Sequence, residues 1–191
     1  MMGIGGGHDR RVMLRAAVWG GAAMLLMLPW VAMRFSTEVD WSGADFLVFG
    51  ALLALACTGW ELLVRLRGGL AWHAGVALAI GTAFLLVWAT LAVGLVGSEQ
   101  HSANRLVAGV LLVAVAAAAL ARCRPTGMAR AMLATAAAQI LLAPIASLAG
   151  AGDRAWGPCL FFAALWLLAG WLFQRAACVD GDAAHRRSPP V

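Results

Sequence analysis

The sequence predicts an all-α fold, a polytopic bundle of transmembrane helices, and three observations carry this prediction. Six apolar runs, each long enough to cross a bilayer, occupy most of the 191 residues. Hydrophobic residues make up 63% of the chain and charged residues 12%, whereas soluble domains have about 45–50% and about 25%. The loops between the runs are short and polar. A hydrocarbon core about 30 Å thick needs about 20 helical residues, and it admits only helices or closed barrels.

The apolar runs give the boundaries of the six predicted spans. These are residues 12–33, 46–64, 70–96, 106–121, 128–148 and 157–173. The third span would be about 40 Å long at ~1.5 Å per residue, so we expect it to tilt or to extend into the interface. The first span has an apolar part too long for a signal peptide and no A-x-A cleavage site, so we expect it to be retained.

The domain organisation follows from these spans. Residues 12–174 form one six-helix transmembrane domain, preceded by a Gly-rich basic tail at 1–11. Residues 175–191 are polar and end in proline and valine, and we expect them to form a disordered tail.

The distribution of arginine predicts the orientation of the spans. Eleven arginines fall on one side of the predicted spans: Arg10, Arg11, Arg15, Arg65, Arg67, Arg122, Arg124, Arg130, Arg175, Arg186 and Arg187. Three fall on the other side: Arg34, Arg105 and Arg154. Short loops are the condition under which the positive-inside rule holds, so both termini are predicted to be cytoplasmic.

The net charge of +5 does not indicate a nucleic-acid partner. All fourteen basic residues are arginine and lie mostly at the ends of apolar runs, without the basic and aromatic face that nucleic-acid binding requires. The four cysteines are widely spaced and form no CxxC motif, so a structural role is expected for each. They are Cys57, Cys123, Cys159 and Cys178.

One pair of ionisable residues is a candidate for chemistry. Glu61 lies one turn before the end of the second span, and His73 opens the third span after a short turn. An antiparallel hairpin would bring them to nearly the same depth, where a carboxylate tunes a histidine across neutral pH. The alternative is structural: Glu61 pairs with Arg65 four residues later, and His73 reaches the headgroups. Trp60 and Trp72 flank the pair as expected for an aromatic belt.

Acidic residues gather in the predicted outer loops. They are Glu38, Asp40, Asp45 and Glu99. Carboxylates and the nearby His101 would suit a metal ion between the loops. Their spacing matches no ordered metal motif, so a solvated acidic surface is the favoured interpretation, and we predict neither metal nor cofactor.

Polar side chains away from the span ends are few. They are Thr58, Thr90, Thr135, Gln139 and Ser147. Threonine and serine can bond to carbonyls of their own helix, and Gln139 can bond to a neighbouring helix. No span holds a buried Asp, Lys or Arg of the kind that ion carriers use.

Two stretches of the sequence are distinctive. The first reads TEVDW at 37–41, DF at 45–46 and EL at 61–62, with Arg65. The second reads FLLVW at 84–88, LAVGLVGSE at 91–99, AN at 103–104, RP at 124–125 and GMARA at 127–131. Together they resemble a family of small, uncharacterised, multi-pass bacterial inner-membrane proteins. After the glutamate the family has Asp-Asn-Pro, whereas this chain has Gln100, His101 and Ser102. The resemblance implies a multi-pass inner-membrane location and carries over no activity.

These features favour a non-enzymatic component of the bacterial inner membrane, in contact with lipid and with a membrane partner or a second copy. The alternative is a small transporter or channel that acts as an oligomer, because six short spans enclose little volume. An intramembrane enzyme ranks last, since no catalytic constellation is visible. A polar cavity reaching the midplane would favour transport, and an apolar interior would favour the membrane component.

Overall fold

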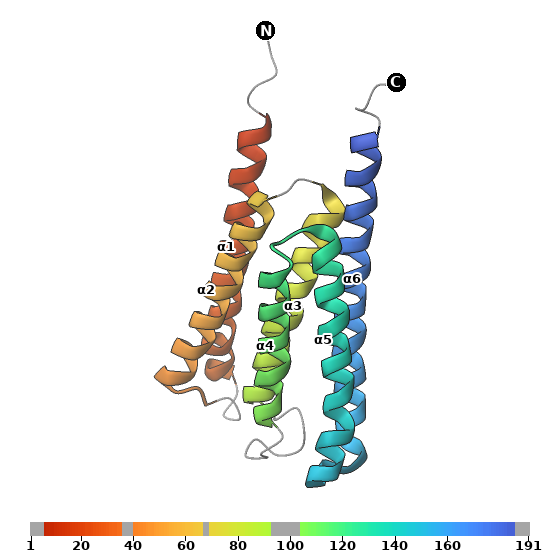
Figure 1. Cartoon of the computed structure of the whole chain (residues 1–191). Coiled ribbons are helices and arrows are strands. Elements are labelled where there is room, and N and C mark those ends of the chain that lie inside the picture. Colours follow the sequence, from red (N-terminus) through yellow and green to blue (C-terminus); the bar gives the residue numbers. More distant parts are fainter. Residues whose placement is uncertain (1–5, 36–39, 67–68, 93–103, 186–191) are drawn as a thin grey trace. The chain divides into compact units, whose positions relative to one another are not determined.

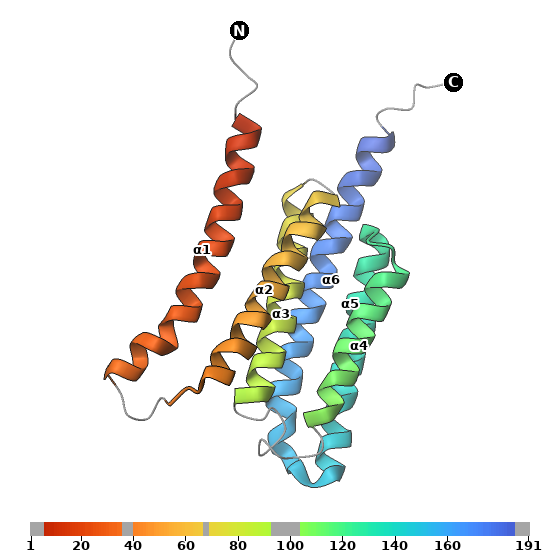
Figure 2. The same ribbon diagram turned by 90° about the vertical axis from the view of Figure 1, so that its left-hand side faces the viewer.

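The computed structural model describes residues 6–35, 40–66, 69–92 and 104–185. Every regular element in these ranges is helical (Figures 1 and 2). The helices are α1 (Gly6–Phe35), α2 (Gly43–Leu66), α3 (Leu70–Ala92), α4 (Asn104–Leu120), α5 (Pro125–Ala146) and α6 (Trp156–His185). A π-helical turn, Ser147–Ala151, and a 3-10 turn, Gly152–Ala155, connect α5 to α6. The predicted all-α class is confirmed for the described residues.

Five helical segments among the described residues are long and apolar enough to cross a membrane. They are Val12–Phe35, Gly43–Leu66, Leu70–Ala92, Pro125–Gly150 and Gly152–Gly181. Each contains or overlaps one predicted span. The remaining predicted span, 106–121, falls on α4, whose apolar part Leu106–Leu120 is shorter. The helices are thus compatible with a multi-pass membrane protein.

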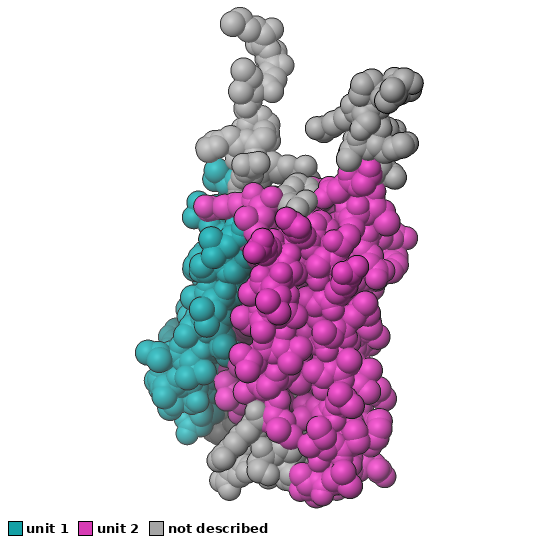
Figure 3. Space-filling view, viewed as in Figure 1, with its two compact units in different colours: residues 1–62 teal, residues 63–191 magenta. Residues whose placement is uncertain are grey.

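The chain forms two compact units, coloured separately in Figure 3. Unit 1 comprises residues 1–62 and contains α1 and most of α2. Unit 2 comprises residues 63–191 and contains the end of α2 and all later helices.

In unit 1, a reciprocal capping box begins α2. The backbone N–H and the hydroxyl of Ser42 both donate to Asp45 Oδ2, at 2.8 and 2.7 Å, and the Asp45 N–H donates to Ser42 Oγ at 3.3 Å. This arrangement satisfies backbone donors that the first helical turn leaves open. Trp41 packs edge-on against Phe46 and Phe49 of the first turns of α2.

In unit 2, α6 packs against α3 and α5, and α4 packs against α5. The largest fully buried side chains include Trp72, Leu86, Trp166 and Phe173. The rings of Trp72 and Phe173 meet edge-on with centroids 5.2 Å apart. A Cβ added at Gly75 would lie 3.1 Å from the Phe173 ring, so the absence of a side chain there admits the phenylalanine.

The prediction that Trp72 belongs to an aromatic belt is wrong, because its side chain is only 1% exposed. Trp72 Nε1 donates to the Leu63 carbonyl at 3.0 Å, across the turn between α2 and α3. The indole therefore satisfies its polar atom inside the protein, as buried tryptophans usually do.

Helix α6 continues to His185, beyond the point at which the sequence predicted a disordered tail. Residues 176–177 and 183–184 are alanine, and no proline occurs between Phe173 and Pro189. Alanine has the highest helix propensity, so helical structure can extend past the last apolar turn of the predicted span.

The turn between α4 and α5 leads to the first testable prediction. Arg122 and Cys123 have left-handed φ values of 47° and 52°. The turn then folds back so closely that a Cβ added at Gly127 would lie 2.8 Å from Ala121 Cβ. We expect Gly127→Ala to lower the free energy of unfolding by about 1 kcal/mol, because overpacking outweighs the gain in helix propensity.

Gly109→Ala in α4 is the matched control, since an added Cβ there meets nothing within 4 Å. It should leave stability unchanged or raise it by up to about 1 kcal/mol. Detergent-micelle unfolding followed by circular dichroism compares the two variants. If the two variants have equal free energies of unfolding, the turn accommodates the added methyl group without loss of stability, and the prediction is wrong.

Candidate functional site

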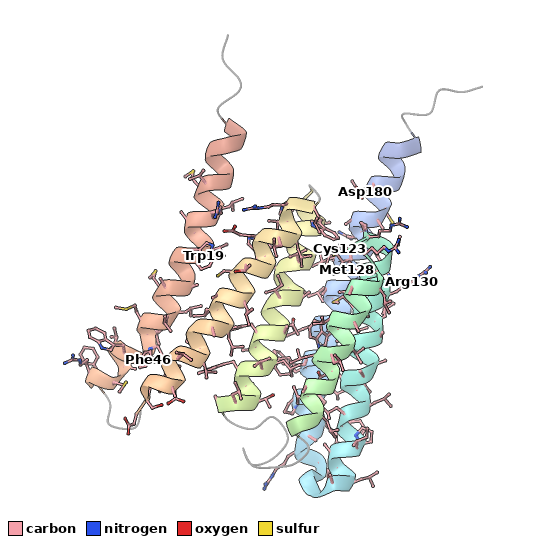
Figure 4. The ribbon with its side chains drawn as sticks, turned by 60° about the vertical axis from the view of Figure 1, so that its left-hand side comes forward. Trp19, Phe46, Cys123, Met128, Arg130 and Asp180 are labelled. Carbon is pink, nitrogen blue, oxygen red and sulfur yellow. The ribbon has the colours of Figure 1, made fainter. Side chains whose placement is uncertain are left out.

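Three side chains of unit 1 meet at one carboxylate oxygen, and we refer to Arg15, Trp19 and Glu61 as the Glu61 cluster. Arg15 Nε and Trp19 Nε1, both from α1, donate to Glu61 Oε1 of α2 at 2.8 and 2.7 Å. The cluster contains an ion pair between residues 46 positions apart in the chain. Figure 4 shows Trp19 on α1, drawn with its side chain.

Helical periodicity places these residues together. Arg15 and Trp19 are four residues apart on α1 and therefore share one face. Arg15 lies about one turn inside the predicted start of the first span, and Glu61 lies about one turn before the predicted end of the second. Since the two spans run in opposite directions, these positions are at similar depth.

The α1–α2 contact continues beyond the cluster. Cys57, one turn before Glu61, is buried, and its Sγ lies 4.0 Å from the Val18 carbonyl oxygen. Further along, a Cβ added at Gly50 would be in ordinary contact with the Leu26 side chain, at 3.7 Å. The cluster is thus the polar end of an otherwise apolar contact between two helices.

The charges of the Glu61 cluster balance. The Glu61 side chain is 13% exposed and that of Arg15 is 62% exposed, so the carboxylate is inside while the guanidinium reaches outward. Long arginine side chains place their charged end at the interface while their methylene groups cover apolar surface. A neutral pair is much less costly near hydrocarbon than either charge alone.

The predicted Glu61–His73 pair is divided between the two units, so the pairing stays a prediction. In unit 2, His73 Nδ1 lies 2.6 Å from the Gly69 carbonyl oxygen. An oxygen acceptor at that distance requires the hydrogen to be on Nδ1. The structure shows Glu61 with Arg15 and Trp19, two partners that the sequence analysis missed. Their shared face and depth on the first span were the available signal.

The predicted outer-loop residues do not form a site among the described residues. Glu38 and Glu99 lie outside the described ranges, and Asp40 is exposed. The Asp45 carboxylate belongs to the capping box of α2. In the described ranges, no group of three or more His, Cys, Asp and Glu side chains could hold a metal ion.

Two of the threonines named from the sequence bond within their own helices: Thr90 and Thr135 donate to the carbonyl oxygens four residues earlier, at 2.7 and 2.9 Å. Thr82, which the sequence analysis did not single out, does the same at 2.7 Å. Ser147 donates instead to the Gly152 carbonyl at 2.8 Å, in the turn before α6. Gln139 is fully buried, but neither of its amide atoms has a hydrogen-bond partner.

Comparisons of the chain with protein-family models, with curated proteins and with solved structures give no match.

Proposed function

We propose that this protein is a non-enzymatic component of a bacterial inner membrane, with six spans and both termini in the cytoplasm. The observation that carries the proposal is the interior of unit 2. Its buried side chains in the described residues are apolar except for Thr82, Thr135 and Gln139. None of these three carries a charge, and a dry interior of this kind favours helix packing over the passage of a charged solute.

The helix α4 supplies the sixth span of the proposal. Its 17 residues correspond to about 26 Å at 1.5 Å per residue, at the lower end of the length that crosses a hydrocarbon core. Local thinning of the bilayer accommodates a short span at modest cost. If α4 did not cross the membrane, α5 would begin on the side where α3 ends. Arg122 and Arg124 would then lie outside, against the positive-inside rule.

The placement of arginines in unit 2 supports the proposed orientation. Arg122, Arg124, Arg130 and Arg175 are exposed, and the start of α5 and the end of α6 lie at the same end of this unit, where Figure 4 labels Cys123, Arg130 and Asp180. Arg154 lies in the turn that joins the opposite ends of α5 and α6. The positive-inside rule assigns the arginine-rich end to the cytoplasm.

Reporter fusions test this topology. Fusions after Arg67, Arg124 and Val191 should give a cytoplasmic signal, and fusions within residues 36–43 or 98–104 should give an external one. A cytoplasmic signal from the loop that contains Glu38 would contradict the whole map. Opposite signals from fusions after Arg67 and Arg124 would remove α4 from the set of spans.

Purification and reconstitution test the proposed role. Purification in mild detergent should recover the chain with a defined membrane-protein partner or as a stable oligomer. Liposomes that contain the purified protein should show the same ion and small-solute flux as empty liposomes. Flux above that of empty liposomes, abolished by substitutions in the interior of unit 2, would favour the transporter alternative.

A further inference from the structure

Among the described residues of unit 2, three buried polar side-chain atoms have no hydrogen-bond partner: Gln139 Nε2, Gln139 Oε1 and Trp166 Nε1. Gln139 is 0% exposed and Trp166 is 1% exposed. Buried polar groups in folded proteins are almost always hydrogen-bonded to protein or to ordered water. Two residues of one helix pair that break this rule together therefore indicate a common ligand.

The register of α5 and α6 brings these residues to neighbouring levels. A Cβ added at Gly170 would lie 3.3 Å from Met132 Cβ and 3.4 Å from the Ala129 oxygen, which fixes where the two antiparallel helices meet. From this contact, Gln139 is about 10 Å along α5 and Trp166 is about 6 Å along α6 in the same direction, at 1.5 Å per residue. Their Cα atoms thus differ in level by about one turn.

The direction of the Trp166 side chain narrows this gap. Each Cα–Cβ bond in a helix tilts toward the N-terminus of that helix. In an antiparallel pair, the Trp166 side chain therefore leans toward the level of Gln139. By the same register, Thr135 on α5 lies level with Trp166.

The protein groups nearby do not replace a ligand. The Gln139 amide lies beside the Cys159 thiol, a weak donor and acceptor, without forming a hydrogen bond of ordinary geometry. The Thr135 hydroxyl donates its hydrogen to the Ala131 carbonyl, so its oxygen can only accept. Together the three residues offer two donor groups, the amide NH₂ and the indole N–H, and two acceptor oxygens.

We propose that Gln139, Thr135 and Trp166 hold one water molecule inside unit 2. The water accepts from Trp166 Nε1–H and Gln139 Nε2–H, and it donates to Gln139 Oε1 or Thr135 Oγ1. A buried water typically makes about three such bonds. A water molecule can both donate and accept hydrogen bonds, so it matches the two donor groups and two acceptor oxygens of these residues. An ion fits less well, because none of the three side chains is charged.

The proposed water lies at a depth where polar side chains need a partner inside the protein. Gln139 and Trp166 lie near the middle of the two candidate spans Pro125–Gly150 and Gly152–Gly181. At that depth no bulk water is available to satisfy a polar group, so an internal partner is required. The water would link α5 to α6 near the middle of both candidate spans.

Indole N–H spectroscopy of the ¹⁵N-labelled full-length protein in lipid nanodiscs tests the proposal. Trp166→Phe and Trp72→Phe assign the two relevant signals. The Trp166 N–H should show magnetisation transfer from a long-lived bound water. Trp72 is the internal control, because it is equally buried and its N–H donates to the Leu63 carbonyl.

The variants Gln139→Leu and Thr135→Val should abolish or weaken the water signal at Trp166. Thr90→Val should not, because Thr90 bonds in the same way to its own helix but lies about 12 Å further along α3 than the level of Trp166, as the Gly75–Phe173 contact sets it, at 1.5 Å per residue. The proposal is overturned if Trp166 in the unmodified protein shows no more transfer from water than Trp72. It is also overturned if Gln139→Leu keeps the signal, or if it raises the melting temperature, as removal of an uncompensated amide would.

Discussion

Replacement of Trp72 by alanine should lower the free energy of unfolding by about 3–5 kcal/mol, the usual cost of removing a large aromatic side chain from a core. Trp72 is 1% exposed, and its ring packs edge-on against Phe173. Its Nε1 also donates to the Leu63 carbonyl, so it ties the end of α2 to α3 and α6. Denaturant titration in detergent micelles, followed by circular dichroism, measures the loss.

Two variants separate packing from hydrogen bonding. Trp72→Phe keeps an aromatic ring beside Phe173 and loses the bond to Leu63, so it should cost about 1–2 kcal/mol. Trp171→Ala is the surface control, because Trp171 is 44% exposed and its ring faces the Arg175 guanidinium at 3.9 Å. If Trp72→Ala were no more destabilising than Trp171→Ala, Trp72 would not be a core residue.

The contrast between these two tryptophans shows what the sequence could predict. Length and apolar composition predicted where five of the helices long and apolar enough to cross a membrane would lie, because a hydrocarbon core sets the length of any helix that crosses it. They do not identify the face of a span that meets another helix. Trp72 and Trp171 both lie near span ends, yet one is in the core and the other is on the surface. Only packing distinguishes them.

The sequence does not show which helix faces meet, and for this reason the sequence analysis missed the partners of Glu61. The sequence drew attention to Glu61, because an ionisable residue in a span is rare. Its partners Arg15 and Trp19 lie more than 40 residues away in the chain, and choosing them requires the pairing of α1 with α2. Local spacing instead favoured Arg65 and His73. Gln139 was recognised as a polar residue of the interior, but its fully buried position between α5 and α6 depends on the register of those helices.

Substitutions in the Glu61 cluster should weaken the contact between α1 and α2. Replacing Arg15 should weaken it more than replacing Glu61. Arg15→Leu removes the guanidinium that pairs with a carboxylate only 13% exposed, and loss of one partner of a sheltered ion pair is costly. Glu61→Leu leaves Arg15, which is 62% exposed and can extend to the headgroups. We expect Arg15→Leu to weaken the α1–α2 contact by about 2 kcal/mol and Glu61→Leu by about half as much.

Cys57 provides a local measurement of this contact. It is buried in unit 1, and its Sγ lies 4.0 Å from the Val18 carbonyl oxygen, so maleimide labelling of Cys57 requires α1 to move away from α2. Since about 1.4 kcal/mol corresponds to a factor of ten, Arg15→Leu should raise the labelling rate about thirty-fold and Glu61→Leu about five-fold. Peptide mass spectrometry separates Cys57 from the other three cysteines.

The double variant Arg15→Leu/Glu61→Leu decides whether charge is the cause. It removes both charges, so its labelling rate should fall below that of Arg15→Leu alone, although the second substitution also removes the acceptor of Trp19. Arg34→Leu is the control, because Arg34 is an exposed arginine at the end of the same helix, stacked 5.0 Å from the centre of the Trp30 ring. If the free-energy effects of the two single substitutions instead add in the double variant, so that their factors on the labelling rate multiply, the two side chains contribute independently. The ion pair would then not hold α1 against α2.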